Sequence, residues 1–195
     1  MRSLESPLRK GKQLRVIGFD DAPFDRDSLD PVNVTGIICS NTRFEGMLWG
    51  QIDRDGLDST QRLVQMVSES KFHDQLNLLL CDGITMAGFN VIDLPKLAEQ
   101  LAIPCLAVMR RQPDLKKFFE AMENTTDMAI RRTLIQRAGE IHSQDGFFFQ
   151  VAGCSPDLAV QALRQLTDKG HVPEALRLAH LIGSAVKTGQ SSKRA

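Results

Sequence analysis

The sequence lacks the patterns that mark several large classes of protein. Its 24 Lys and Arg residues equal its 24 Asp and Glu residues, so no net charge draws the chain toward nucleic acid or anionic lipid. Any contact with nucleic acid must therefore use a local basic patch. No apolar run approaches the roughly 20 residues that span a bilayer, and residues 1–7 lack a signal-peptide core. We expect a soluble, cytoplasmic protein that does not associate with a membrane.

Several common catalytic and metal-binding motifs are also missing. The four cysteines lie far apart, without the paired spacing of metal ligands, and we expect reduced, buried thiols at Cys39, Cys81, Cys105 and Cys154. The four histidines show no paired-ligand spacing, and we expect surface or helix positions for His73, His142, His171 and His180. No Gly-x-Ser-x-Gly elbow occurs, so nucleophilic catalysis has no support in the sequence.

The length and the order of predicted elements indicate a compact α/β protein. A chain of 195 residues can bury a core of its own, so we expect one domain over 1–195, with flexible ends at 1–12 and 188–195. Apolar patterns predict strands over 14–19, 32–39, 44–52, 76–81, 103–109 and 147–151. Helical patterns cover 58–68, 92–101, 114–122, 126–138, 156–166 and 173–186, and the helices at 114–122 and 126–138 are expected outside the central layers.

This order predicts a ribonuclease H-like fold. Three antiparallel strands come first, and strands separated by helices follow, which implies right-handed crossovers and a parallel half-sheet. The predicted architecture has three layers, with a mixed central sheet and helices on both faces. A crossover helix would then return the strand at 76–81 to the side of the strand at 14–19. An ordinary doubly wound sheet is the alternative.

Two aspartates each close an apolar strand. Asp20 follows Leu14–Phe19, and Asp82 follows Leu76–Cys81. Catalytic and ligand-binding groups of open α/β sheets gather at the carboxyl ends of strands, so these carboxylates have a ready route to holding a divalent metal. Mg²⁺ or Mn²⁺ held there could assist phosphodiester hydrolysis. The alternative is turn chemistry, because aspartate also favours tight turns.

A third carboxylate for the same site has two candidates. Asp58 opens the helix predicted at 58–68, where it could point toward the same edge of the sheet; the alternative is an N-cap with Gln61 three residues on. Glu45 is the competing candidate, and its alternative is a solvent-facing strand residue. We count Asp58 with Asp20 and Asp82 as the candidate catalytic residues.

Two features near these aspartates could bind a phosphate group. The glycine-bearing loop that begins at Gly83 could present backbone N–H groups to an anion. Arg110 and Arg111 follow the strand ending at Met109, where a guanidinium group can bind phosphate through two hydrogen bonds. We therefore expect Gly83 and Arg110 to bind substrate phosphate. A solvated basic turn is the alternative for the arginines.

The chain resembles the endonuclease V superfamily, and more closely its uncharacterised sister group, domain of unknown function family 99. Ile17–Asp20 is similar to the family motif that carries the first metal-binding aspartate, and Leu80–Gly83 to the Val-Asp-Gly motif that carries the second. Pro173–His180 resembles the Pro-Glu-Pro-Leu-Arg-Leu-Ala run of the last helix. Thr42–Leu48 and Gly83–Asn90 look like signatures of the sister group. The resemblance covers residues 15–186.

The departures from endonuclease V bear on the reaction. The family's catalytic glutamate has no clean match, and Asp58 lies nearby. Its Pro-Tyr-Ile-Pro wedge is absent from a chain without tyrosine. The family's lysine is replaced by Arg110, which stays charged and is a poor proton carrier. Its late histidine corresponds to Cys154, which would not replace a histidine acting on metal-bound water.

The resemblance implies a divalent-metal-dependent nuclease that acts on DNA or RNA. Asp20 would bridge metal and attacking water, Asp82 would complete the metal site, and Arg110 would hold phosphate. One alternative is a nucleic-acid-binding protein that kept the fold and lost the reaction. Another is a metal-dependent hydrolase of a small phosphorylated molecule. A closed pocket over Asp20 and Asp82 would favour this alternative, whereas an open groove flanked by Arg110 and Lys116 would favour the nuclease.

Overall fold

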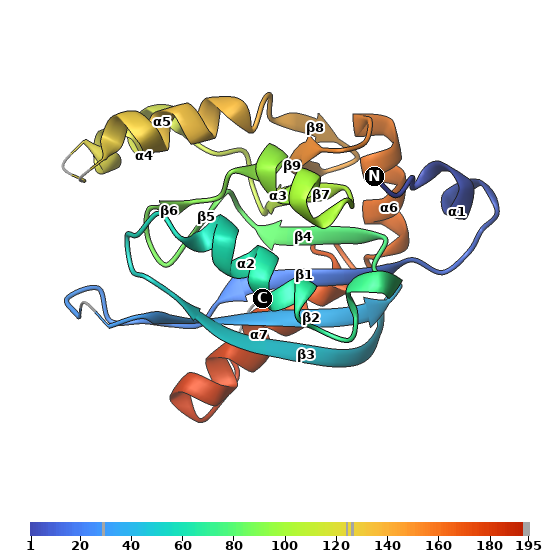
Figure 1. The fold of residues 1–195 in the computed structure, drawn as a ribbon, viewed down its shortest axis with the longest axis horizontal. Helices are drawn as coiled ribbons and strands as arrows, with labels where there is room; N and C mark the ends of the chain where they lie inside the picture. The colour runs from blue at the N-terminus through green and yellow to red at the C-terminus, as the bar shows by residue number, and fades with distance from the viewer. Residues whose placement is uncertain (29, 124, 126, 193–195) are drawn as a thin grey trace.

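The computed structural model describes residues 1–28, 30–123, 125 and 127–192. Its centre is a seven-stranded mixed sheet in the order β3-β2-β1-β4-β7-β9-β8 (Figure 1). The strands are β1 (Arg15–Asp21), β2 (Val32–Ser40), β3 (Arg43–Ile52), β4 (Leu78–Asp82), β7 (Cys105–Met109), β8 (His142–Gln144) and β9 (Phe147–Ala152).

The sheet has the predicted ribonuclease H-like arrangement. β1, β2 and β3 form an antiparallel meander, and β4 returns to pair parallel with β1, with Phe19 opposite Cys81. β7 continues the parallel part, and β9 and β8 add an antiparallel edge. All but the last residue of β4 are buried, as expected for a strand covered on both faces. The α/β prediction is therefore confirmed, and the doubly wound alternative is wrong.

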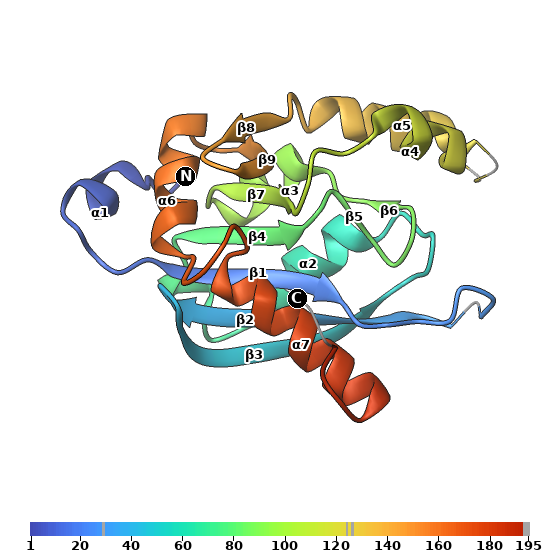
Figure 2. The same ribbon diagram turned by 180° about the vertical axis from the view of Figure 1, so that it is seen from behind.

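Helices cover both faces of the sheet. On one face lie α2 (Ser59–Ser68) and α3 (Leu94–Leu101), and on the other α6 (Pro156–Gln165) and α7 (Glu174–Thr188), as Figures 1 and 2 show. Alternate residues of β1 supply the two cores: Ile17 and Phe19 belong to the core under α2 and α3, and Val16 to the core under α6 and α7. Successive strand side chains point to opposite faces, so one strand serves both layers.

Two helices form an arm beside the sheet. α4 (Leu115–Met122) and α5 (Met128–Arg137) lie outside the two main cores, as predicted, and extend past the carboxyl ends of β4 and β7 (Figure 1). A small cluster that contains Val91, Met122 and Ile135 is buried between them and the rest of the chain. Asp114 starts α4 by accepting a hydrogen bond from the Lys117 N–H.

The structure contains several elements that the sequence did not predict, among them a short 3-10 helix at His73–Gln75. The segment predicted as a loop from Gly83 contains a hairpin of β5 (Thr85–Met86) and β6 (Asn90–Val91). The short strand β8 was not predicted. The segment 1–12, predicted to be flexible, carries α1 (Glu5–Arg9), and Arg2 donates hydrogen bonds to the carbonyls of His73 and Leu76.

Further expectations concern the ends, the thiols and the membrane. Residues 193–195 of the expected flexible end lie outside the described residues. All four cysteines are free thiols, and three are buried, with Cys154 half-buried. Within the described ranges, we find no helix whose length and apolar character would let it cross a membrane.

Candidate metal centre

Asp20 and Asp82 lie together where the central strands β1 and β4 end, at the carboxyl-terminal edge of the sheet. β1 and β4 are parallel neighbours, and each aspartate directly follows a residue of the last matched pair, Phe19 and Cys81. The side chain of Asp20 is buried, with 6% of the residue exposed, although it carries a carboxylate. The strand order therefore brings Asp20 and Asp82 together, as their positions at the ends of two strands predicted.

His180 joins these carboxylates from α7. Its Nδ1 lies 2.9 Å from Oδ2 of Asp20. The hydrogen bond to Asp20 is the main cause that raises the pKa of His180, and the Asp20 charge adds to it, while partial burial lowers it. A tautomer or an imidazolium with hydrogen on Nδ1 donates this bond. The contact fixes the orientation of the ring relative to the strand ends.

The packing of α7 explains why His180 reaches the site. Gly18 of β1 lies so close to α7 that an added Cβ atom would come within 2.8 Å of the Ala175 carbonyl carbon. Ala175, Leu176 and Ala179 are buried against the sheet, and His180 follows Ala179 on the next position of the helix. The close approach of helix and strand thereby places the imidazole over the end of β1.

Asp20, Asp82 and His180 form a group that could hold a metal ion. One ligand atom of each residue lies within 4.8 Å of those of the other two. Carboxylate oxygen is the ligand that Mg²⁺ and Mn²⁺ prefer, and imidazole is a common ligand of transition metals. Burial and the charge of Asp20 raise the pKa of Asp82, which is the conflict that a bound cation would relieve. The donor set therefore fits a divalent cation.

Asp21 is a third carboxylate at this edge, and its role was not predicted. Its Oδ2 accepts a hydrogen bond of 2.6 Å from the Ala87 N–H of the β5–β6 turn. Burial, and then repulsion from Asp20 and Asp82, raises its pKa to about 6. Since strand neighbours point to opposite faces, Asp21 faces the hairpin while Asp20 faces α7.

Two arginines line the hollow around the carboxylates. Nη2 of Arg110 donates a 2.8 Å hydrogen bond to Oδ2 of Asp82, and this ion pair partly offsets the rise in the Asp82 pKa. Arg26, from the segment after β1, is exposed and lines the same hollow, whose volume is about 460 Å³. The site thus has positive side chains beside the carboxylates and opens to solvent at Arg26.

The structure does not bring Asp58 or Glu45 into this group. Asp58 stands at the N-cap of α2, but its carboxylate accepts hydrogen bonds from Asn90 Nδ2 at 2.7 Å and from the Asp53 N–H at 3.1 Å. Glu45 pairs with Arg15 at the start of β1, at the opposite edge of the sheet from Asp20. Local hydrogen bonding therefore explains Asp58, and an ion pair explains Glu45.

Gly83 has a structural role in the turn after β4, which differs from the predicted role in binding substrate phosphate. Its φ of +86° is in the left-handed region that favours glycine. Its N–H donates to the Val108 carbonyl at 2.8 Å, so this group is occupied and does not serve a phosphate. The other expected groove residue, Lys116, pairs with Glu120 on α4 and is not among the residues that line the hollow.

His180 lies on a helix, α7, as predicted, but its part in the site was not predicted, and Cys154 lies elsewhere. Cys154 follows β9, whose Ala152 pairs with Cys105 at the start of β7, so it lies at the edge opposite Asp82. His180 supplies an imidazole to the site from another element. One signal was available: His180 ends the Pro173–His180 run that carries the family resemblance.

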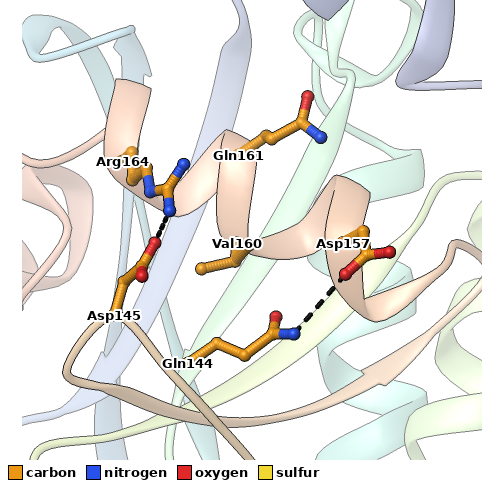
Figure 3. A pocket seen from close by; sticks show the side chains of 6 residues that line it. All are labelled: Gln144, Asp145, Asp157, Val160, Gln161 and Arg164. Atoms are coloured by element: carbon orange, nitrogen blue, oxygen red, sulfur yellow. Dashed lines mark hydrogen bonds and ion pairs between the residues drawn. The ribbon is translucent and has the colours of Figure 1, made fainter.

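Another hollow lies on the surface away from the carboxylates, between α6 and the β8–β9 turn (Figure 3). Its polar side chains contact one another: Arg164 forms an ion pair with Asp145, and Gln144 Nε2 donates to Asp157 at 3.4 Å. Gln161, on the same helix, is exposed. None of the predicted site residues lines this hollow.

The fold and the site define an α/β protein with a candidate divalent-metal centre where β1 and β4 end. The chain belongs to the endonuclease dU family, whose sequence model matches residues 12–187. The UPF0215 protein of Archaeoglobus fulgidus is 38% identical over 184 residues, which cover 94% of this chain and 99% of that protein. The UPF0215 protein of Methanopyrus kandleri is 36% identical over 196 residues, which cover 96% and 99%.

Solved structures agree with this placement. A protein of unknown function from Archaeoglobus fulgidus superimposes with a TM-score of 0.84 at 37% identity, covering 89% of this chain and 98% of that chain. Endonuclease V of Ciona intestinalis, in complex with a 24mer DNA containing an inosine followed by a ribo-adenosine, gives 0.56 at 12% identity and covers 87% and 84%. The catalytic domain of human endonuclease V gives 0.59 at 16%, covering 94% and 86%. The two endonuclease V structures establish likeness of fold alone.

Proposed function

We propose that this protein is a divalent-metal-dependent endonuclease that hydrolyses phosphodiester bonds in DNA containing deoxyuridine. The observation that carries the proposal is the group of Asp20, Asp82 and His180, whose ligand atoms lie within 4.8 Å of one another at the sheet edge. Membership of the endonuclease dU family supports the reaction and the modified base. The Ciona intestinalis endonuclease V complex with DNA supports nucleic acid as the kind of partner.

Asp20 and Asp82 would hold the cation, which we propose to be Mg²⁺ or Mn²⁺. Mg²⁺ binds through one or two carboxylates and substrate phosphate while keeping several waters. When bound, the cation supplies neutralisation of the charge that develops on the phosphate oxygens.

His180 can take part in proton transfer. Its raised pKa keeps the imidazolium populated closer to neutral pH than an isolated histidine, and a proton carrier works best when its pKa lies near the working pH. The bond to Asp20 holds Nδ1, so the ring is oriented before substrate arrives. We assign His180 the exchange of a proton at this edge of the sheet, a role that arginine or cysteine fills poorly.

Arg110 and Arg26 would hold the phosphate. The guanidinium of Arg110 is already oriented by Asp82, and its planar donors match two phosphate oxygens. Arg26 lies on the exposed side of the hollow, where a polynucleotide backbone can pass. This opening to solvent favours a polymer over a small phosphorylated molecule, whose site would enclose it.

The test is nicking of labelled single- and double-stranded DNA that carries one deoxyuridine, in Mg²⁺, in Mn²⁺ and in EDTA. Wild type should cleave only with a divalent cation. Asp20→Asn and Asp82→Asn should abolish cleavage and the metal-induced rise in melting temperature together. His180→Gln should slow cleavage about 100-fold or more, in the range of lost acid–base catalysis.

Asp74→Asn is the matched control, because the Asp74 side chain is 95% exposed and, among the described residues, is in no group that could hold a metal ion. It should cleave as wild type does. Cleavage that survives Asp20→Asn or Asp82→Asn would overturn the assignment of the site. Binding of the same DNA by wild type, without cleavage in either metal, would instead identify a nucleic-acid-binding protein on this fold.

A further inference from the structure

The strand β3 forms an open edge of the sheet. It pairs with β2 on one side only, and we find no hydrogen bond from the backbone of its outer side to another described segment. After an irregularity near its start, residues 46–52 pair regularly with β2, and this stretch contains no charged residue and no proline. Proteins that stay monomeric protect such an edge with lysine, proline, a bulge or a covering segment, because an open edge pairs with a strand of another chain.

Three large apolar side chains of β3 are exposed beside this edge. Phe44 is 48% exposed, and Met47 and Trp49 are each 39% exposed. Met47 lies opposite Ile37 of β2, and Phe44 lies opposite Cys39; both partners belong to the core under α6 and α7. Paired residues of neighbouring strands share a face, so these side chains and Trp49, two positions beyond Met47, face the side of α7. Exposed apolar side chains that gather on one surface mark an interaction site.

The end of α7 carries another exposed apolar side chain. Val186 is 60% exposed. The C-terminal end of α7 extends past the β3 edge of the sheet, as Figures 1 and 2 show. It does so near the end of β3, because Lys187 lines a hollow together with Val32, and Val32 pairs with Ile52. The helix therefore overhangs the open edge at one end of the strand.

We propose that the β3 strand of a second copy of this chain occupies the edge, paired antiparallel about a two-fold axis, so that the two sheets join into one. Charge complementarity selects this occupant. Arg43 begins β3 with its side chain 78% exposed, and exposed Asp53 follows the last residue of the strand. In antiparallel copies, Arg43 of each chain lies toward Asp53 of the other, whereas parallel copies bring like charges together. A two-fold axis forms the favourable contact twice.

The same charges select the register of the two strands. With the axis at Leu48, Met47 of each copy lies against Trp49 of the other, which joins the apolar side chains of both. With the axis at Trp49, Glu45 would lie opposite Asp53 of the other copy, and like charges directly opposite destabilise a strand pair. The register centred on Leu48 is therefore favoured.

The two-fold arrangement also covers the overhanging helix. Because the strands run in opposite directions, the end of β3 in one copy lies beside the start of β3 in the other. The end of α7, with Val186, then lies over the exposed Phe44 of the second copy. β1 and β4 lie inside the sheet, so both metal centres stay accessible, and the inference does not depend on the proposed reaction.

The first test uses wild type, in which Trp49 is the only tryptophan. Sedimentation velocity from micromolar to millimolar concentration should show a reversible equilibrium between monomer and dimer. The tryptophan emission should shift to shorter wavelength as the dimer forms, because Trp49 leaves water. A monomer at every concentration would overturn the inference and leave a strand of a different protein as the occupant. A dimer that forms without the shift would place the contact elsewhere and overturn it as well.

Trp49→Lys tests the edge directly, because lysine is a residue that protects natural edge strands. It should raise the dissociation constant of the dimer at least about 10-fold, the effect of losing a central aromatic contact, while circular dichroism stays as in wild type. Ile130→Lys, at a 49% exposed position of α5, is the matched control and should dimerise as wild type does. Dimerisation of folded Trp49→Lys with wild-type affinity would contradict the inference.

Charge reversal tests the antiparallel pairing. Arg43→Glu alone and Asp53→Arg alone should each raise the dissociation constant about 10-fold, because each places like charges together at both ends of the contact. An equimolar mixture of the two variants should recover the wild-type affinity, since each chain then meets the opposite charge at both ends. A mixture that associates no better than either variant alone would overturn the antiparallel arrangement.

Discussion

Asp21 has the most perturbed environment of the three carboxylates at the sheet edge. Its side chain is buried beside Asp20, and it faces the β5–β6 turn, where the Ala87 N–H is its hydrogen-bond donor. Burial and repulsion together outweigh that hydrogen bond and raise its pKa from 3.8 to about 6. An ionised Asp21 therefore opposes folding of the metal-free protein.

We expect Asp21→Asn to change the pH dependence of stability without metal. A carboxyl group whose pKa is higher in the folded state favours folding below its unfolded pKa of 3.8, and this contribution is lost as the pH rises through about 6. In EDTA the variant should therefore match wild type near pH 4 and exceed it at pH 8, by no more than about 3 kcal/mol. Asparagine can still accept from Ala87.

Thermal unfolding between pH 4 and pH 8 measures this difference. Asp25→Asn, at an exposed position of the segment after β1, is the control and should differ from wild type by a similar amount at every pH. A gain by Asp21→Asn that is the same at pH 4 and pH 8 would show that repulsion and burial of the ionised carboxylate are not its cause.

At the scale of elements, the contact of α7 with β1 places His180. Gly18 is the closest point of that contact, and the atoms that a Cβ would meet belong to the helix backbone at Ala175 and Leu176. Gly18→Ala must therefore displace the helix, and overpacking of this kind costs about 1–3 kcal/mol. We expect the variant to lose stability and to weaken metal binding, because His180 moves with the helix.

Gly50→Ala is the matched control for Gly18→Ala. Its added Cβ would meet the tip of the Met66 side chain, a flexible group that can move aside. Chemical denaturation should show a clearly larger loss for Gly18→Ala, and a metal titration followed by melting temperature should show a weaker response for that variant alone. Equal losses in both variants would mean that α7 is free to shift without consequence for the site.

Arg131 joins the α4–α5 arm to the segments beside the metal centre. It is 1% exposed, and its guanidinium donates hydrogen bonds to the carbonyls of Asp55, Gly56 and Phe89. Arg131→Met keeps the length of the side chain and removes every donor, which leaves three half-buried carbonyls without these donors, at up to about 1–3 kcal/mol each. We expect a loss of about 3 kcal/mol or more in the free energy of unfolding.

Hydrogen exchange locates the effect of Arg131→Met. Backbone amides of β5, β6 and α5 should exchange faster in the variant, while those of β1 and β4 should change little under conditions where the protein stays folded. Arg132→Met, at the next, exposed position of α5, is the control; it removes a contact over the Phe119 ring of α4 but no hydrogen bond to the hairpin, and should leave β5 and β6 as in wild type. Faster exchange throughout the sheet would show global destabilisation in place of a local anchor.

These elements also show what the sequence could predict. The unbroken apolar run of β4 and the meander before it were sufficient for the strand order, which made Asp20 and Asp82 neighbours. The rotation of α7 depends on the fit of Ala175 against Gly18, a contact between residues 157 positions apart, and no local pattern reveals it. His180 was missed for that reason, and the Pro173–His180 run that carries the family resemblance was the one signal that pointed to it. Asp58 does stand at the start of α2, but its carboxylate accepts from Asn90 and from the Asp53 N–H, and the contact with distant Asn90 has no local signal in the sequence.

At the scale of the whole molecule, equal numbers of positive and negative residues limit how DNA can be held. Arg26 and Arg110 are the arginines that line the hollow of the carboxylates. Each phosphate contact releases counterions, and the logarithm of the affinity for duplex DNA falls with the logarithm of salt concentration by about 0.9 per contact. Two contacts predict a shallow slope of about −2.

We expect anisotropy titrations of duplex DNA with the Asp20→Asn variant in Ca²⁺, between 50 and 300 mM salt, to give that slope of about −2. Adding Arg26→Ala should reduce its magnitude by about 1, because one phosphate contact is lost. Adding Arg9→Ala instead should not change the slope, since α1 lies at the opposite end of the sheet from the arrowheads of β1 and β4 (Figure 1).

A slope much steeper than −2 would mean that DNA contacts basic residues beyond the hollow. The arm, with exposed Arg111 and Lys116 near its start, would then be the first surface to examine. A slope unchanged by Arg26→Ala would remove Arg26 from the phosphate path and leave Arg110, held by Asp82, as the arginine beside the carboxylates that meets the strand.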